Sequence, residues 1–550
     1  MSKSTSPSYG SGFSAYLAIA LPVVGYLIYS RYFSGSLFYA DDFHLLKTVQ
    51  WAKEADGWLE KVRLFYQQHQ EHRIVVPRLL TLADYYLEGH IGWKSLIFFA
   101  NVVWCSTIFI LWKIFRSLGI SSWYFIPVPW LLLHPQYYEN VTWSISILQQ
   151  SDVVFLFTLL AYLCARKKYN LALLISVVAT FTHGNGLFSF PIAIVFSLID
   201  KNRKSSARLA VTFFIIALIY FYGFKSGQNA SISQSLADPL NLIQSFGVFF
   251  GSTTLIAAKN YVIAALAGLF LIGSLTAWSV MTLRKSIAGK GSALPDRFLW
   301  GITAFLFVTG SLVVATRSWQ GVETIAAPRY LHYSSYVLCI FYLVALRVTS
   351  GSFRKSLGIA FIPAALLLTL LSYFNFTPHV RFLRDQLLAE ESNYVNHGVF
   401  LQYFPSFNRN ISEPYRNAVA SGVIRMSDRL PYDSTSETLS SIPLTVTLDS
   451  IRLEDASRSS AERVVRISST ERPGKQVFLA IRAEGQTPYW IPVFTQRAAY
   501  RSLLTSGALL GNGFEGTAIL NNLPPGSYRI GLYTEGAVSW TDQYLPVSSE

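Results

Sequence analysis

Residues 261–283 read YVIAALAGLFLIGSLTAWSVMTL, a stretch without a single charged side chain. A helix of about 17–25 mostly apolar residues is long enough to cross the hydrocarbon core of a bilayer. Similar stretches recur through the first two thirds of the chain, which predicts a polytopic α-helical membrane protein of about eleven spans. The expected spans are 14–33, 95–115, 121–134, 144–165, 169–183, 186–200, 207–224, 261–283, 298–316, 330–347 and 356–374.

The composition supports this interpretation. Hydrophobic residues make up 51% of the chain and charged residues only 14%, whereas soluble proteins carry about 25% charge. This composition argues strongly against a soluble cytosolic enzyme. The third expected span contains Pro127 and Pro129, so a break or tilt is expected there. The stretch 240–258 is expected to form either a loop or an interfacial or re-entrant helix.

The net charge of +14 lies in the hydrophobic part of the chain. Residues 1–375 hold 29 Lys and Arg against 14 Asp and Glu, and residues 376–550 hold 16 against 17. With the N-terminus inside, seventeen of the basic residues fall in short inner segments, as the positive-inside rule requires. The excess charge therefore indicates orientation and not a nucleic-acid partner. We expect a bacterial inner membrane protein with a cytoplasmic N-terminus and a periplasmic or extracellular C-terminal region.

Three regions follow from these patterns. Residues 1–375 form the transmembrane domain, with 34–94 as its first outer loop carrying interfacial helices. Residues 376–440 form a helical connector, and 441–550 form a β-sandwich of about seven short strands, rich in Val, Ile, Thr, Tyr and Phe. Most aromatic residues of this last region are expected in its core, although exposed ones could stack on carbohydrate. The candidates are Tyr489, Trp490, Trp540 and Tyr544.

The first outer loop carries two candidate motifs. Asp41 and Asp42 follow within ten residues of the first span, and adjacent carboxylates so close to a membrane suggest either catalysis or a helix cap. Further along, His72, Arg73 and Arg78 form a basic stretch, whose alternative interpretation is a helix facing lipid headgroups.

More polar groups occur where other spans reach the outer side. Each alone could cap a turn, but polar groups at membrane depth are costly and usually mark a functional cavity. Their convergence on one face is the stronger signal. The groups are His134–Asn140 with Glu139, the HGNG stretch with His183 and Asn185, Lys225, the stretch from Arg317 to Gln320, and Arg329 with Tyr330.

This layout resembles the GT-C glycosyltransferases, such as protein O-mannosyltransferases, lipid A aminoarabinose transferases and mycobacterial arabinosyltransferases. The shared features are an acidic pair after the first span, interfacial helices in the first outer loop, and a soluble outer domain at the end. The resemblance implies a polyprenyl-phosphate-linked sugar as donor. Independently, nucleotide sugars are cytoplasmic, and no inner loop offers an Asp-x-Asp pair or a glycine-rich phosphate cradle.

The expected reaction is a single displacement, with a carboxylate taking the proton of the acceptor hydroxyl. Asp42 or Asp41 is the predicted base, and the acceptor is a glycan, lipid or protein. The guanidinium fork suits phosphate oxygens, so the predicted donor-phosphate residues are basic: Arg73, Arg78, Arg329, Lys225, His72 and His183. Tyr330, Asn185 and Glu139 are predicted to bind substrate. No cofactor is required by this scheme, and a divalent metal bound by the acidic pair stays an alternative.

Three other functions stay open. An O-antigen polymerase or ligase also has several spans, although its large loop normally comes late in the chain. A lipid or glycan transporter would show paired repeats and charges in mid-span. A membrane scaffold carrying a β-domain would not need Asp41 and Asp42.

Overall fold

The computed structural model describes residues 9–225, 227, 230–426, 430, 438, 439, 442–455, 458–471, 477–534 and 536–548. The chain divides into two compact units, and each is described by itself. The helical unit comprises Met1–Tyr32, Glu54–Thr81 and Leu96–Tyr373. The sheet unit comprises Phe33–Lys53, Leu82–Ser95 and Phe374–Glu550, so it takes in two pieces of the loop between the first two expected spans.

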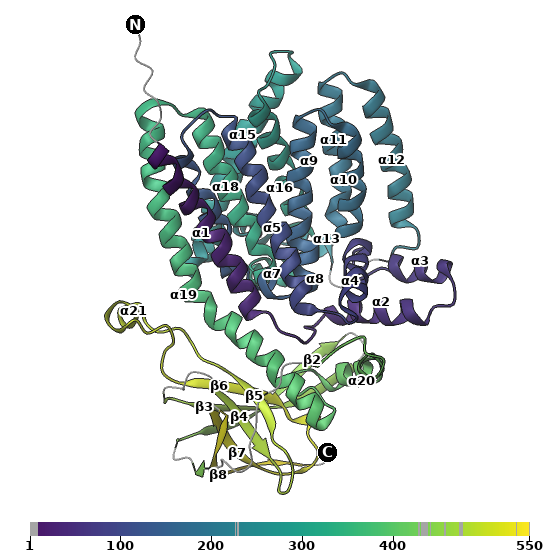
Figure 1. Cartoon of the computed structure of the whole chain (residues 1–550), viewed down its shortest axis with the longest axis vertical. Coiled ribbons are helices and arrows are strands. Elements are labelled where there is room, and N and C mark those ends of the chain that lie inside the picture. The colour runs from purple at the N-terminus through teal and green to yellow at the C-terminus, as the bar shows by residue number, and fades with distance from the viewer. Residues whose placement is uncertain are drawn as a thin grey trace. The chain divides into compact units, whose positions relative to one another are not determined.

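Long helices stand side by side in the helical unit (Figure 1). The helices that lie wholly or partly in this unit are α1 (Tyr9–Phe33), α3 (Trp58–Tyr66), α4 (Val75–Glu88), α5 (Trp93–Arg116), α6 (Pro127–Leu132), α7 (Tyr138–Thr142), α8 (Ser144–Ser146), α9 (Asp152–Ala165), α10 (Tyr169–Thr182), α11 (Ser189–Ile199), α12 (Arg203–Phe221), α13 (Ile232–Ala237), α14 (Pro239–Gly251), α15 (Tyr261–Ile287), α16 (Leu294–Arg317), α17 (Val322–Ile325), α18 (Leu331–Val348) and α19 (Gly351–His397). Short helical turns join them: η1 (Ser122–Phe125), η2 (Pro135–Tyr137), the π-helical η3 (Ile147–Ser151), η4 (Gly184–Phe188), η5 (Ser252–Ile256), η6 (Ser318–Gln320) and η7 (Pro328–Tyr330).

Eight helices among the described residues are long and apolar enough to cross a membrane, as expected of a membrane-embedded protein. They are Phe13–Phe33, Trp93–Arg116, Ser144–Ala165, Arg203–Phe221, Tyr261–Ile287, Leu294–Gln320, Pro328–Val348 and Gly351–His397. The predicted count of eleven is not confirmed. The other three expected spans correspond to shorter helices: α10, α11, and the pair η1 and α6. Pro127 and Pro129 lie in the first turn of the six-residue α6, so α6 cannot continue η1 as one α-helix.

The stretch 240–258 forms α14 and η5, and α14 packs tightly against α15. Three glycines allow the close approach. A Cβ atom on Gly251 would lie 1.9 Å from the carbonyl oxygen of Ala264, and one on Gly268 would lie 1.8 Å from the carbonyl oxygen of Gly247. Any larger residue at these positions would force the two helices apart.

The sheet unit combines helices with one eight-stranded, mostly antiparallel sheet. The strand order is β1-β8-β7-β4-β5-β6-β3-β2, and only the β1–β8 pair is parallel. The expected two-sheet sandwich is therefore not confirmed. The elements are α2 (Asp42–Glu54), the second part of α19, α20 (Pro405–Ala420), α21 (Tyr500–Ser506), η9 (Leu520–Asn522), β1 (Thr438–Leu439), β2 (Thr445–Asp455), β3 (Arg458–Ser469), β4 (Val477–Arg482), β5 (Tyr489–Phe494), β6 (Phe514–Ile519), β7 (Gly526–Thr534) and β8 (Ala537–Val547).

Both faces of the central strands are buried. On β4, Leu479 and Ile481 join one apolar cluster, whereas Phe478 and Ala480 join another that includes Ala389 of α19. Burial on both faces explains why β4 reads as continuous apolar sequence and does not alternate. Of the four aromatic candidates, three are buried and fill the core, and only Tyr544 is exposed. The buried three are Tyr489, Trp490 and Trp540.

Candidate functional site

Polar side chains from separate segments of the helical unit meet where several helices begin or end. We call this set the polar network. It is drawn from the turn after α3, from α7, from η3, from the α10–η4 junction, from the end of α16, and from η7 and α18. Its members are Glu71, His72, Glu139, Asn140, Gln150, His183, Asn185, Arg317, Arg329 and His332.

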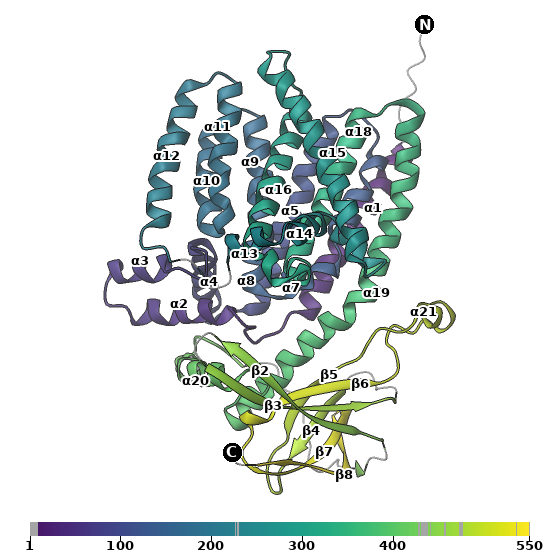
Figure 2. The same cartoon turned by 180° about the vertical axis from the view of Figure 1, so that it is seen from behind.

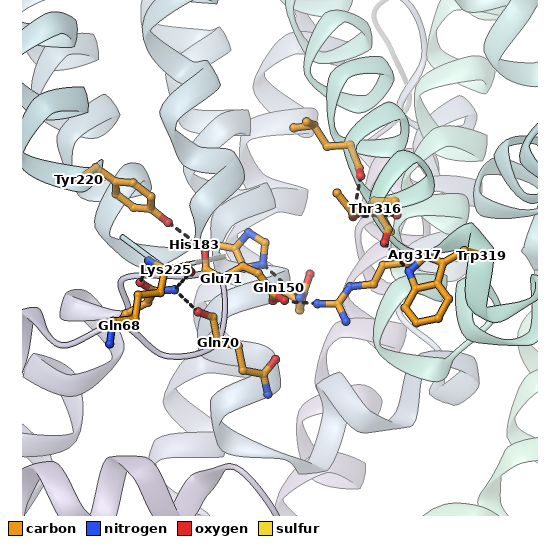
Figure 3. Close-up of polar contacts among 12 residues, drawn as sticks. Gln68, Gln70, Glu71, Gln150, His183, Tyr220, Lys225, Thr316, Arg317 and Trp319 are labelled. Atoms are coloured by element: carbon orange, nitrogen blue, oxygen red, sulfur yellow. Dashed lines mark hydrogen bonds and ion pairs between the residues drawn. The ribbon is translucent and has the colours of Figure 1, made fainter. Parts of the chain in front are cut away.

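A tight turn presents the first two members. The main chains of His69 and His72 exchange two hydrogen bonds of 2.7 and 2.8 Å, and Gln70 between them has a left-handed φ of +47°. This geometry directs the Glu71 carboxylate to Arg317, whose Nη2 lies 2.9 Å from Oε2 (Figure 3). Both side chains are only 16% exposed, so the ion pair is partly shielded from solvent.

The HGNG stretch brings His183 against His72. The two rings lie 4.0 Å apart between centroids. Both positions, 184 and 186, need glycine. A Cβ atom on Gly184 would lie 2.8 Å from His72 Nδ1. One on Gly186 would lie 1.9 Å from the Ala179 carbonyl oxygen. Gly184 therefore leaves room for the two imidazoles to meet, and Gly186 lets the turn pack against α10.

Hydrogen bonds hold the His183 ring on both sides. Its Nδ1 lies 2.8 Å from Asn185 Oδ1 and accepts the N–H of Asn185 over 3.4 Å, and its Nε2 lies 3.2 Å from the amide nitrogen of Gln150. Burial lowers the pKa of His183 to about 4, opposed by the Asn185 bond and helped by the charge of Arg317. Burial likewise lowers the pKa of His72 well below its usual range, and His183 adds to the shift. Both rings are neutral at pH 7.

Gln150 extends the network toward α18. It lies in η3, and π-helical turns of this kind occur frequently at functional sites. Its carbonyl accepts from His332 Nε2 over 3.2 Å, and His332 Nδ1 accepts from the Asn140 amide over 2.8 Å. Asn140 also donates to the carbonyl of Arg329 over 2.9 Å. The imidazole of His332 is thus held as its Nε2–H tautomer.

Arg329 and Glu139 form the second ion pair of the network. Arg329 Nη1 lies 3.4 Å from Glu139 Oε2, and the guanidinium lies over the Tyr330 ring at 5.2 Å. Burial raises the pKa of Glu139, and Arg329 partly offsets that effect. The network therefore holds two guanidinium groups, each balanced by one carboxylate.

Arg73 and Arg78 bind main-chain carbonyls of their own surroundings. Arg73 donates to the carbonyls of Tyr220, Tyr66 and Tyr222 over 2.6, 2.7 and 2.6 Å. Arg78 donates to two carbonyls at the end of α3, including that of Phe65 at 2.8 Å, and burial lowers its pKa to about 10. Both side chains are buried, so these contacts hold the turn after α3, and a phosphate role for them stays a prediction.

The position of Lys225 is fixed by hydrogen bonds to its main chain. The side-chain amide of Gln68 accepts from the Lys225 N–H over 2.9 Å and donates to its carbonyl over 2.6 Å (Figure 3). The Lys225 residue itself is exposed. It therefore lies beside the Glu71 turn as a cation open to solvent, and its predicted role in binding phosphate is untested.

Asp41 and Asp42 belong to the sheet unit, in the turn before α2. The Asp42 carboxylate accepts the N–H of Tyr39 over 3.2 Å, and the Asp42 N–H donates back to the Tyr39 carbonyl over 3.0 Å. Ala40 has a left-handed φ of +45°. Asp42 is buried and Asp41 is partly exposed. Asp42 thus closes the turn that precedes α2, and both the catalytic role of the pair and the helix-cap alternative stay predictions.

Several members of the network were not assigned from the sequence. Glu71 lies in the first outer loop and Asn140 and Arg317 in polar stretches at expected span ends, and none of the three was given a role. Gln150 and His332 lay inside expected spans, and the cost of polar side chains at that depth was the available signal. No group of three or more His, Cys, Asp or Glu among the described residues could hold a metal ion. Comparison with protein-family models, curated proteins and solved structures gave no match.

The buried histidines should make stability depend on pH. As the pH falls from about 6.5 to about 4, the unfolded chain gains a proton that folded His183 does not accept, so the free energy of unfolding should fall. The loss is about 1.4 kcal/mol per unit of pKa shift. Thermal unfolding of the purified chain from pH 7 to 4 should show a shallower slope for His183→Gln, whereas His90→Gln, in the partly exposed bend between α4 and α5, serves as control. An unchanged slope in His183→Gln would contradict this assignment.

Proposed function

We propose that the protein is a membrane glycosyltransferase of the GT-C type that moves a sugar from a polyprenyl-phosphate donor to an acceptor outside the cytoplasm. The observation that supports it best is the polar network, which gathers two guanidinium groups and neutral histidines at helix ends. With the orientation expected from the inner basic residues, this end of the bundle faces outward. A lipid-linked donor is the sugar donor available there.

The charge balance of the network suits a phosphodiester. Arg317 and Arg329 are each already paired with one carboxylate. For Arg317, only Nη2 has a partner among the described residues, so further N–H groups of its fork can reach phosphate oxygens. A sugar linked through polyprenyl phosphate carries one negative charge, which such a site can hold without a metal.

The donor-phosphate assignment predicts opposite effects for two neighbours. Arg317→Ala should weaken binding of farnesyl phosphate at least tenfold, about 1.4 kcal/mol, because the site loses a cation. Glu71→Gln should tighten binding, because it frees that cation from its carboxylate. Arg329→Ala should also weaken binding. Affinity is measured on the full chain in lipid nanodiscs from the ligand-dependent rise in unfolding temperature.

Two controls make the result decisive. Farnesol has the same chain without phosphate and should bind weakly to every variant. Arg347→Ala removes a guanidinium from the opposite end of α18, where Arg347 pairs with Asp296, and should leave affinity unchanged. Equal binding of farnesyl phosphate by Arg317→Ala, Arg329→Ala and the parent chain would remove the network from the donor site.

A further inference from the structure

The sheet unit carries a loop with a short helix that has no buried residue. This α21 loop comprises residues 496–511, between β5 and β6, and α21 stands clear of the strands in both views (Figures 1 and 2). Its two legs are paired: the Ala498 N–H donates to the Leu509 carbonyl over 3.1 Å, and the Gly511 N–H donates to the Gln496 carbonyl over 2.9 Å. The pairing holds the tip as a defined shape.

The α21 loop presents apolar side chains to solvent. Leu504 is 86% exposed, Leu509 is 60% exposed and Tyr500 is 39% exposed. A helix of seven residues is too short to be stable alone in water. Leucines presented on such a helix need an apolar environment to cover them.

The positive charge of the loop indicates which apolar environment covers these leucines. Residues 496–511 contain Arg497 and Arg501 and no acidic residue. Basic residues beside leucine and tyrosine are typical of segments that lie in the interface of an anionic bilayer.

The base of the loop lies beside the residue where an apolar span ends. Within the sheet unit, Tyr500 donates to Asn375 Oδ1 over 3.2 Å, and its ring lies 5.5 Å from that of Phe374. The Arg497 guanidinium lies over both rings, at 5.4 Å from Phe374 and 4.3 Å from Tyr500. Phe374 is the last residue of the expected span 356–374, so this contact places α21 at the level where hydrocarbon gives way to headgroups.

We propose that the α21 loop inserts into the lipid surface beside α19 and anchors the sheet unit to the membrane. Leu504 and Leu509 enter the boundary between headgroups and acyl chains, and Arg501 meets anionic headgroups. This inference is independent of the proposed transferase activity, since it needs only the membrane and the sheet unit.

The test uses a fluorescent label at the tip. The three native cysteines are buried, so a thiol-reactive NBD label on Leu504→Cys reports the tip alone. The full chain is placed in nanodiscs of phosphatidylglycerol and phosphatidylethanolamine. A nitroxide near the headgroup end of the lipid chains should quench the label at least twofold more than at Tyr544→Cys, an exposed control on β8. Aqueous iodide should show the reverse order.

Three further outcomes bear on the proposal. Arg501→Glu in the same background should reduce lipid quenching, because the loop then carries a charge that anionic headgroups repel. Quenching of residue 504 by iodide alone would overturn the proposal. Protection from both iodide and lipid nitroxide would also overturn it, since a protein surface would then cover the loop.

Discussion

In the full chain carrying either Asp41→Asn or Asp42→Asn, sugar transfer should fall by about 100-fold or more in the variant that has lost the general base. An amide cannot take the proton of an attacking hydroxyl, whereas the shape of the side chain is kept. The substitution of the other aspartate should cost less, because in the proposed mechanism that residue only orients the acceptor. The measurement is surface-glycan modification, quantified by mass spectrometry at matched expression in a strain lacking its own copy.

The structure makes this test sharper by separating catalysis from folding. Asp42 accepts the N–H of Tyr39, and the amide oxygen introduced by Asp42→Asn can accept the same bond, so the turn before α2 should persist. Unfolding temperatures of both variants should therefore stay near that of the parent chain. Asp56→Asn, an exposed carboxylate between α2 and α3, is the matched control and should keep full activity. Full activity in both Asp41→Asn and Asp42→Asn would contradict the proposed mechanism.

The spans were predictable because length and apolar composition alone define a helix that crosses a membrane. Eight expected spans coincide with helices of that kind, including 261–283, which lies within α15. The other three expected spans correspond to shorter helices because particular residues interrupt the helix. At 121–134, Pro127 and Pro129 start a new helix and separate it from η1, and at His183 an extended residue separates α10 from η4.

The strands were also predictable, but their arrangement was not. Runs such as VFLAIR and YWIPVF form β4 and β5 as expected. The sequence pattern does not show which strands pair, so the single sheet order with β1 beside β8 could not be derived from it.

For the candidate site, the type of residue showed which side chains could join a polar network. The sequence did not show which groups each of these side chains would bind. The HGNG stretch and Arg329 do join one network, as their place at span ends suggested. Arg73 has the same chemistry as Arg317, yet Arg73 donates to carbonyls and Arg317 to a carboxylate. Such differences arise from tertiary contacts between segments more than a hundred residues apart, which no local pattern encodes.

The charges near the opposite helix ends illustrate the same point and carry the largest expected effect on stability. Arg297 counted in the sequence as one of the orienting inner charges, but it is buried in a bidentate ion pair. Its Nη1 and Nη2 lie 2.7 Å from Oδ1 and Oδ2 of Asp200. Tyr169 donates to the same carboxylate, and Arg297 reaches the carbonyl of Cys164 over 3.3 Å. One pair thus ties the ends of α9, α10, α11 and α16.

This pair and the polar network lie at opposite ends of α10 and α16. The helix α16 carries Arg317 at its other end, and His183 lies at the other end of α10. Burial alone would raise the pKa of Asp200, but the bonds from Arg297 and Tyr169 and nearby positive charge lower it. The carboxylate therefore stabilises the fold above its ordinary pKa, and that contribution is lost only as the pH falls through the lowered value.

Arg297→Ala should lower the free energy of unfolding by about 3–5 kcal/mol, because it leaves a buried carboxylate without its partner. The Asp200 side chain is 7% exposed, so water cannot replace the guanidinium. Lys167, 3.4 Å away and mostly exposed, compensates only in part. Arg297→Lys should fall in between, since an ammonium keeps the charge and loses the fork. Denaturant unfolding of the purified chain in detergent measures the difference.

The neighbouring pair offers the control. Arg347 meets Asp296 with the same fork geometry, at 2.8 and 3.0 Å, but its side chain is 40% exposed. Arg347→Ala should therefore cost at most about 1 kcal/mol. The double substitution of Asp200→Asn with Arg297→Met removes both buried charges together, and it should recover much of the loss seen in Arg297→Ala. If Arg297→Ala and Arg347→Ala were equally mild, burial of the Asp200 carboxylate would not govern the stability of this end of the bundle.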